Sequence, residues 1–161
     1  MRPAYDRLAT LDELLRRAGE LSAKTLVFDV EPLVAHWESG QDALDQGVKS
    51  VLARTRAIPG VQVVCFSTNS FRRPSIPLAG DGVRAEYLVS AGKPLRTSYY
   101  RDFPRPGVVI GDQLATDGAL ARRLGYAFLQ YYPGMRSLPL GPRLMDWSGQ
   151  LLRPLFFAHP R

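Results

Sequence analysis

The segment TLVFD at residues 25–29 is the most informative about the fold, because its apolar run leads directly into a carboxylate. The same design recurs in VQVVCFS at 61–67 and in GVVIGD at 107–112. Short apolar runs of this kind are typical of strands that are buried on both faces of a parallel sheet. We therefore predict strands at 25–28, 61–66 and 107–110, each with a polar residue at its carboxyl end.

Helical patterns and turn residues alternate with these strands. The pair Thr10 and Glu13 has the spacing of a capping box and predicts a helix over 10–19. Gly125 is a typical residue to end a helix. The other predicted elements are strands at 87–89 and 127–129 and helices at 41–57, 95–103, 115–124 and 142–152.

This alternation of strands and helices predicts an α/β fold. We expect a Rossmann-like three-layer sandwich with a central parallel sheet of about five strands and no large cap domain. The whole chain, 1–161, is interpreted as a single domain, with its core at about 10–133 and a C-terminal extension at 134–161.

The composition narrows the class of protein. Of the 161 residues, 45% are hydrophobic and 22% are charged, which is ordinary for a globular domain. A single cysteine, Cys65, excludes a disulfide within the chain, and we expect it to be an inert buried side chain. We expect no signal peptide and a cytoplasmic location, with peripheral contact to a membrane as an extension of that expectation.

The net charge of +6 is concentrated in the C-terminal part, where residues 96–161 contain nine Arg and four Asp. Such a basic region could face phosphate-bearing partners, or it could reflect only a preference for arginine. We do not expect nucleic acid as a partner, because no basic and aromatic motif of a nucleic-acid-binding module is present.

Polar side chains follow four of the predicted strands. Asp29, Ser67 and Asp112 come directly after strands, Lys93 follows the strand at 87–89, and Asp117 begins the helix after Asp112. Because the carboxyl ends of parallel strands form the usual site in such sheets, we expect these groups to meet. Carboxylates are suitable ligands for Mg²⁺, and a strand-end aspartate can attack phosphorus.

In this order, the residues resemble the haloacid dehalogenase (HAD) superfamily of phosphatases. The resemblance rests on DVEPL at 29–33, STN at 67–69, Gly-Lys-Pro at 92–94 and GDQLATD at 111–117, and it covers about 10–133. The Gly-Lys-Pro, the GDQLATD string and the nearby Trp37 are most similar to the capless class IIIA group, which includes phosphatidylglycerophosphate phosphatases.

The resemblance implies a role for each matched residue. Asp29 would be the nucleophile, Glu31 the general acid and base, Ser67 a ligand of the phosphoryl group, and Lys93 its electrostatic support. Thr68 and Asn69 belong to the same second motif and would contact substrate. The implied Mg²⁺ ligands are Asp29, the backbone carbonyl of Glu31, Asp112 and Asp117.

Two positions of the first motif depart from the family pattern. Glu31 stands where the family has Asp, and Leu33 stands where a hydroxyl or small branched residue is usual. One reading is an Mg²⁺-dependent phosphomonoester hydrolase that forms an aspartyl-phosphate and acts on a bulky or lipid phosphate, because a capless site is open. The alternative is a catalytically impaired HAD-fold module that binds a phosphorylated ligand or a protein partner.

Other side chains have more than one interpretation. Arg72 and Arg73 could bind an anionic substrate or form a solvated pair of charges. We expect Trp37 to lie in the core rather than to contact substrate, and His36 to be a surface or packing residue rather than a catalytic one. The apolar residues of the tail (Leu151, Leu152, Leu155, Phe156 and Phe157), with Arg143, Arg153 and Arg161, could contact an anionic membrane, pack back on the sheet or form a homodimer.

Overall fold

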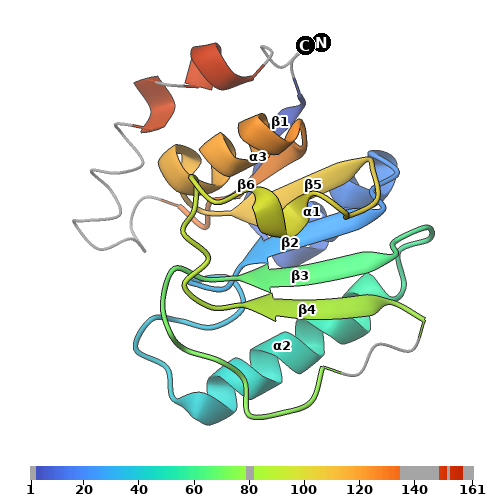
Figure 1. Ribbon diagram of the computed structural model, residues 1–161, viewed down its shortest axis with the longest axis vertical. Coiled ribbons are helices and arrows are strands. Elements are labelled where there is room, and N and C mark those ends of the chain that lie inside the picture. Colours follow the sequence, from blue (N-terminus) through green and yellow to red (C-terminus); the bar gives the residue numbers. More distant parts are fainter. Residues whose placement is uncertain (1–2, 79–81, 135–148, 152, 158–161) are drawn as a thin grey trace.

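The computed structural model describes residues 3–78, 82–134, 149–151 and 153–157. Within them, six strands form one parallel sheet in the order β1-β6-β5-β2-β3-β4 (Figure 1). The strands are β1 (Tyr5–Leu8), β2 (Thr25–Asp29), β3 (Val63–Ser67), β4 (Arg84–Leu88), β5 (Gly107–Gly111) and β6 (Ala127–Tyr131). The α-helices that flank the sheet are α1 (Leu11–Glu20), α2 (Gln41–Thr55) and α3 (Ala119–Leu124).

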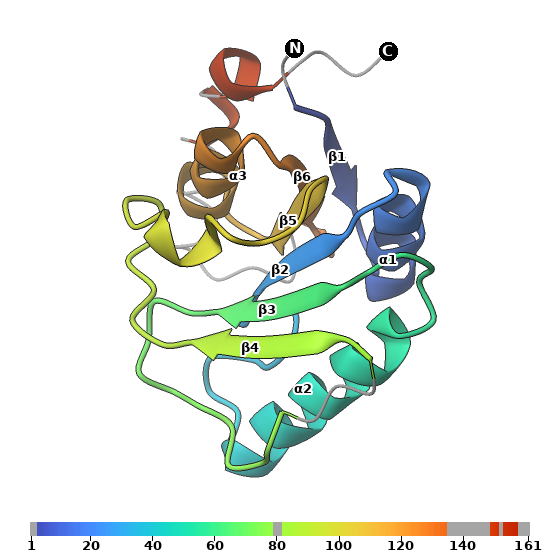
Figure 2. The same ribbon diagram turned by 45° about the vertical axis from the view of Figure 1, so that its right-hand side comes forward.

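Helices cover both faces of the sheet, so the protein is an α/β three-layer sandwich, as predicted. Helices α1 and α2 lie on one face and α3 on the other (Figure 2). The described residues contain no large cap domain. The central strands alternate between two cores: Leu26 and Phe28 pack with α1 and α2, whereas Val27 packs on the side of α3. This alternation follows from the period of two along a strand.

Local signals fixed two helix ends correctly. The Thr10 hydroxyl accepts a hydrogen bond from the backbone N–H of Glu13, whose carboxylate accepts one from the N–H of Thr10, so the capping box is present. Gly125 ends α3 with φ of +69°, a left-handed conformation that favours glycine.

The sheet has one strand more than the predicted five. Strand β1, at Tyr5–Leu8, pairs with β6 and lies before residue 10, where we expected the core to begin. Its sequence escapes a search for apolar runs because only Tyr5 is buried. Tyr5 donates a hydrogen bond from its hydroxyl to Gln130 Oε1 on β6, at 2.5 Å.

Two predicted helices were wrong in detail. Residues 95–103 hold only a 3₁₀ helix, η1 (Ser98–Tyr100), because the segment turns at Gly92 and is bounded by prolines at 94 and 104. The predicted helix 115–124 begins as a π-helical turn, η2 (Leu114–Gly118), and only then becomes α3.

Most of the predicted helix 142–152 lies outside the described residues, although 149–151 and 153–156 are helical. Phe157 is buried and stacks on Tyr5 and Phe128, with ring centroids 5.4 and 5.8 Å away, so this part of the tail packs back on the sheet. Leu151 and Leu155 are exposed. Among the described residues, no helix combines the length and apolar character needed to cross a bilayer.

Candidate functional site

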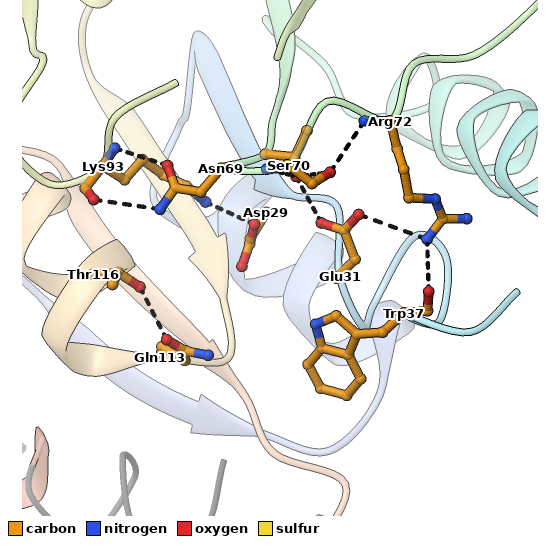
Figure 3. Close-up of a pocket in the computed structure, with 10 residues that line it drawn as sticks. Asp29, Glu31, Trp37, Asn69, Ser70, Arg72, Lys93, Gln113 and Thr116 are labelled. Atoms are coloured by element: carbon orange, nitrogen blue, oxygen red, sulfur yellow. Dashed lines mark hydrogen bonds and ion pairs between the residues drawn. The ribbon is translucent and has the colours of Figure 1, made fainter. Parts of the chain in front are cut away.

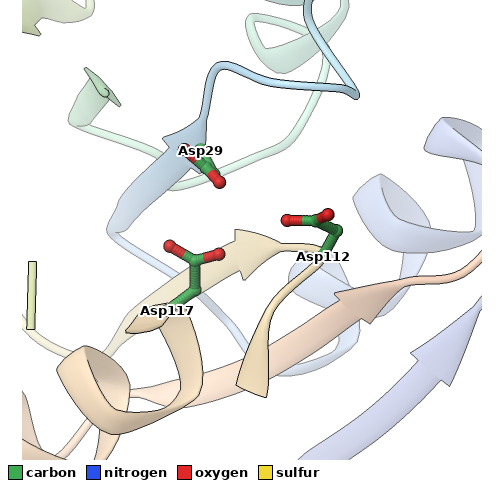
Figure 4. A group of neighbouring side chains, drawn as sticks. All are labelled: Asp29, Asp112 and Asp117. Carbon is green, nitrogen blue, oxygen red and sulfur yellow. The ribbon is translucent and has the colours of Figure 1, made fainter. Parts of the chain in front are cut away.

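Three aspartates meet at the carboxyl edge of the two central strands. Asp29 ends β2 and Asp112 directly follows β5, and these strands pair in parallel so that Phe28 lies opposite Ile110. Asp117 reaches the same place from η2 (Figure 4). One carboxylate oxygen from each residue lies within 4.8 Å of the others. The cluster could hold a metal ion.

The position of Asp117 depends on a glycine and a wide turn. In η2, the backbone N–H groups of Asp117 and Gly118 both donate to the carbonyl of Gln113, at 2.9 and 3.2 Å. This turn sets the Asp117 carboxylate against Gly111, where an added Cβ would lie 2.3 Å from Oδ2. Gly111 is therefore the residue that lets the third carboxylate approach the end of β5.

Lys93 is the cation of this cluster. Its ammonium donates to Asp29 Oδ1 at 2.7 Å, to Asp117 Oδ1 at 2.8 Å and to the carbonyl of Ser67 at 3.3 Å. Burial alone would lower the pKa of Lys93, but the carboxylates of Asp117 and Asp29 outweigh it, so the pKa is raised and the ammonium stays charged.

The surroundings of Asp29, in contrast, disfavour its charged form. Burial, followed by repulsion from Asp117, raises its pKa well above the ordinary value, and Lys93 only partly offsets this. One lysine thus faces three carboxylates in a buried place. A divalent cation would supply the missing positive charge.

Asn69 joins the loop after β3 to the loop after β4. Its Oδ1 accepts from the N–H of Lys93 at 2.9 Å, and its Nδ2 donates to the Lys93 carbonyl at 3.4 Å. Both contacts are with the backbone of Lys93. They fix the point from which the lysine side chain extends toward Asp29, and Asn69 itself lines the pocket (Figure 3).

Glu31 is buried, and its carboxylate lies between Thr68 and Arg72. Oε2 accepts from the Thr68 hydroxyl at 2.9 Å. Oε1 has no hydrogen-bond partner within the described part of the chain, and it lies 3.7 Å from Nη1 of Arg72. The carboxylate is therefore held through Oε2, and Oε1 remains able to accept a hydrogen bond.

Arg72 holds the loop that follows β2. Its guanidinium donates to the carbonyls of His36 and Trp37 at 3.0 and 3.4 Å and to the carbonyl of Ser39 at 2.8 Å. Most of its donors are engaged within the protein. The arrangement makes Arg72 a bridge between Glu31 and this loop as well as a lining residue of the pocket.

Ser67, which we expected to bind the phosphoryl group, does not line the pocket. The side chain of Ser67 is fully buried on the face that carries Cys65, and its hydroxyl shares a hydrogen bond of 2.8 Å with the hydroxyl of Tyr100. Burial raises the pKa of Tyr100 to about 12. Only the Ser67 backbone carbonyl reaches the aspartate cluster, through Lys93.

The pocket has a volume of about 270 Å³ and opens beside the aspartate cluster (Figure 3). Its lining residues are Asp29, Glu31, Trp37, Thr68, Asn69, Ser70, Arg72, Lys93, Gln113 and Thr116. Six of the residues selected from the sequence line it together: Asp29, Glu31, Thr68, Asn69, Arg72 and Lys93.

Four lining residues were not selected as site residues: Trp37, Ser70, Gln113 and Thr116. Our expectation that Trp37 lies in the core was wrong, since its side chain is 37% exposed and contacts His36 edge-on. Gln113 and Thr116 lie within the GDQLATD string, from which we had selected only the two aspartates as site residues.

Comparisons of the chain with models of protein families, with curated proteins and with solved structures find no match.

Proposed function

We propose that the chain is an Mg²⁺-dependent phosphomonoester hydrolase of the HAD type that acts through an aspartyl-phosphate. The observation that carries the proposal is the buried Lys93 ammonium, bonded to Asp29 at the end of β2 and to Asp117 beside β5. These groups lie at the carboxyl edge of a parallel sheet, where α/β proteins bind their ligands.

The donor set fits a hard divalent cation. Carboxylates from Asp29, Asp112 and Asp117 would hold it. The resemblance of the first motif would add the Glu31 carbonyl as a further ligand. Mg²⁺ is the ion we propose, because such sites take oxygen ligands and commonly serve phosphate chemistry. When bound, the ion would polarise the phosphoryl group and offset the repulsion between its oxygens and the aspartates.

Asp29 would act as the nucleophile. Lys93 bonds to Oδ1, which leaves Oδ2 to form the new bond to phosphorus while the bond from phosphorus to the ester oxygen breaks. The departing alkoxide takes a proton to become an alcohol. Water then attacks phosphorus, loses a proton, and regenerates the carboxylate with release of inorganic phosphate.

Glu31 would transfer these protons. It would give one to the alkoxide in the first step and take one from water in the second. Thr68 anchors Oε2, and the other oxygen, Oε1, would be the one that exchanges the proton. Because Glu is one methylene longer than Asp, its carboxylate oxygens lie farther from the backbone than those of an Asp would. Misplacement of a catalytic group by about 1 Å can cost roughly 100-fold in rate.

The substrate class that we propose is a bulky phosphate, including a phosphate carried by a lipid. No large cap domain covers the pocket among the described residues, so the substrate itself must exclude water. A cytoplasmic protein that contacts the membrane peripherally would meet this requirement.

The test is hydrolysis of an aryl phosphate with and without Mg²⁺. We expect the wild type to require Mg²⁺ and Asp29→Asn to lose essentially all turnover, because the amide cannot attack phosphorus. Asp102→Asn is the matched control, since Asp102 is exposed on another segment. Equal activity in Asp29→Asn and wild type would contradict the proposal.

A second candidate function is binding of a phosphorylated ligand without turnover. The observation that favours it is that Glu31 accepts a hydrogen bond from Thr68 and lies 3.7 Å from Arg72, contacts that would give its side chain a structural role. Glu31→Asp separates the two candidates. A silent wild type that gains Mg²⁺-dependent turnover on this substitution would favour the binding module, whereas an active wild type would favour the enzyme.

A further inference from the structure

Two strongly exposed apolar side chains lie on loops beside the pocket. Phe71 is 81% exposed and lies between the lining residues Ser70 and Arg72. Leu95 is 73% exposed and follows the lining residue Lys93 by two positions. A single exposed apolar residue is ordinary, but two large ones beside the same pocket point to a contact surface.

The two loops are bound to one another. They follow neighbouring parallel strands, β3 and β4, and leave the sheet at the same edge (Figure 1). Asn69 bonds twice to the backbone of Lys93, and the N–H of Ser90 donates to the carbonyl of Ser70 at 2.8 Å. Phe71 and Leu95 each lie two residues beyond the Asn69–Lys93 link, so both side chains project from one bonded pair of loops.

The segments of these loops that carry the two apolar side chains contain only basic charged residues. The segment 69–78 contains two arginines and no acidic residue, and the segment 91–101 contains one lysine and two arginines and no acidic residue. Arg73 and Arg96 are exposed, next to or near the two apolar side chains. Lys93 is committed to the buried aspartates and Arg72 to the carbonyls of residues 36–39. Arg73 and Arg96 are therefore the exposed cations nearest in the sequence to Phe71 and Leu95.

We propose that Phe71, Arg73, Leu95 and Arg96, here called the rim, form a docking surface for an anionic lipid membrane. Apolar tips flanked by arginines match the layering of a bilayer surface, where acyl chains lie below anionic headgroups. The charge complementarity favours an anionic lipid surface over a protein partner, because each exposed apolar side chain has an exposed arginine within two residues of it in the sequence. The rim would hold the pocket against the membrane surface.

The proposal differs from docking through the C-terminal tail. Leu151 and Leu155 are 64% and 65% exposed, but their helical segment leads to Phe157, which packs on β1 and β6 at the other end of the sheet. These leucines therefore provide a matched control: two exposed apolar side chains of similar size, far from the rim in the order of the sheet.

The test is co-sedimentation of the full chain with vesicles of phosphatidylcholine that contain or lack phosphatidylserine. We expect binding to the anionic vesicles that weakens as salt rises. Phe71→Ser with Leu95→Ser should reduce the partition coefficient roughly tenfold or more, and Arg73→Gln with Arg96→Gln should reduce it to a similar extent. Leu151→Ser with Leu155→Ser should bind like the wild type.

Each contrary outcome overturns the proposal. A wild type that stays in the supernatant at every composition would assign the rim to a protein partner, and loss of binding only in the Leu151 and Leu155 variant would assign docking to the tail. Binding that none of these variants weakens would also contradict it. Vesicle binding needs no turnover, so its failure is distinct from a failure of the proposed hydrolase activity.

Discussion

Replacing Lys93 with methionine tests the electrostatic account of the site. The side chain is 3% exposed, and it is the shared partner of Asp29 and of the fully buried Asp117. Methionine replaces the lysine chain up to its Cε and removes only the ammonium, which leaves two buried carboxylates facing each other. Removing one partner of a buried ion pair costs about 3–5 kcal/mol. For a domain of this size, that loss corresponds to a Tm lower by about 10 °C.

The pH dependence of the Lys93→Met penalty follows from the direction in which the pKa of Asp29 is shifted. In metal-free protein the pKa of Asp29 is raised, first by burial and then by Asp117. A carboxyl group with a raised pKa in the folded state contributes stability at low pH and loses it as pH rises through that pKa. The Lys93→Met penalty should therefore be largest near neutral pH and should shrink as pH falls, because a protonated carboxyl no longer needs the ammonium.

The assay is urea and thermal unfolding of both proteins in chelator, across this pH range. Lys24→Met is the matched control, because Lys24 is exposed and should tolerate the same change with little effect on Tm. If Lys93→Met unfolds at the temperature of the Lys24→Met control, or if its penalty grows toward low pH, the reasoning about the buried cluster is refuted.

Two further predictions concern the shape of the site. Gly111→Ala should lower the affinity for Mg²⁺, measured as Mg²⁺-induced stabilisation, by about 10- to 100-fold, because the new methyl group displaces Asp117. Gly40→Ala is the control, since its methyl group meets no atom within 4 Å, and equal Mg²⁺ affinities of the two variants would count against the assignment. Arg72→Ala should speed proteolysis near residues 36–39, because it removes the hydrogen bonds to their carbonyls. Arg73→Ala is the control, because the Arg73 side chain is exposed, and equal cleavage rates of the two variants would contradict the role of Arg72.

The sequence was sufficient to predict the strands whose residues are almost all buried. The apolar runs of β2, β3 and β5 each ended in a polar residue, and one parallel sheet was enough to place Asp29 beside Asp112. Strand β1 escaped prediction because it is an edge strand with a single buried residue, and its pairing comes from β6 rather than from its own composition.

Contacts between distant loops could not be predicted in the same way. Arg72 reaches the carbonyls at 36–39 across more than thirty residues, and nothing in its neighbours along the chain indicates that bridge. The direction of Ser67 was available from the alternation along β3, which puts it on the same face as Cys65. The wide turn of η2 depends on the fit of Asp117 against Gly111, which only the folded chain supplies.

The most direct test of the proposed chemistry is to trap phosphoryl-enzyme. A phosphomonoester would be mixed with the protein and Mg²⁺, quenched in acid within the first turnover, and digested for mass spectrometry. We expect a phosphoryl adduct on Asp29 that disappears in Asp29→Asn or when Mg²⁺ is chelated. Turnover that proceeds with no adduct on Asp29, and at an undiminished rate in Asp29→Asn, would contradict it.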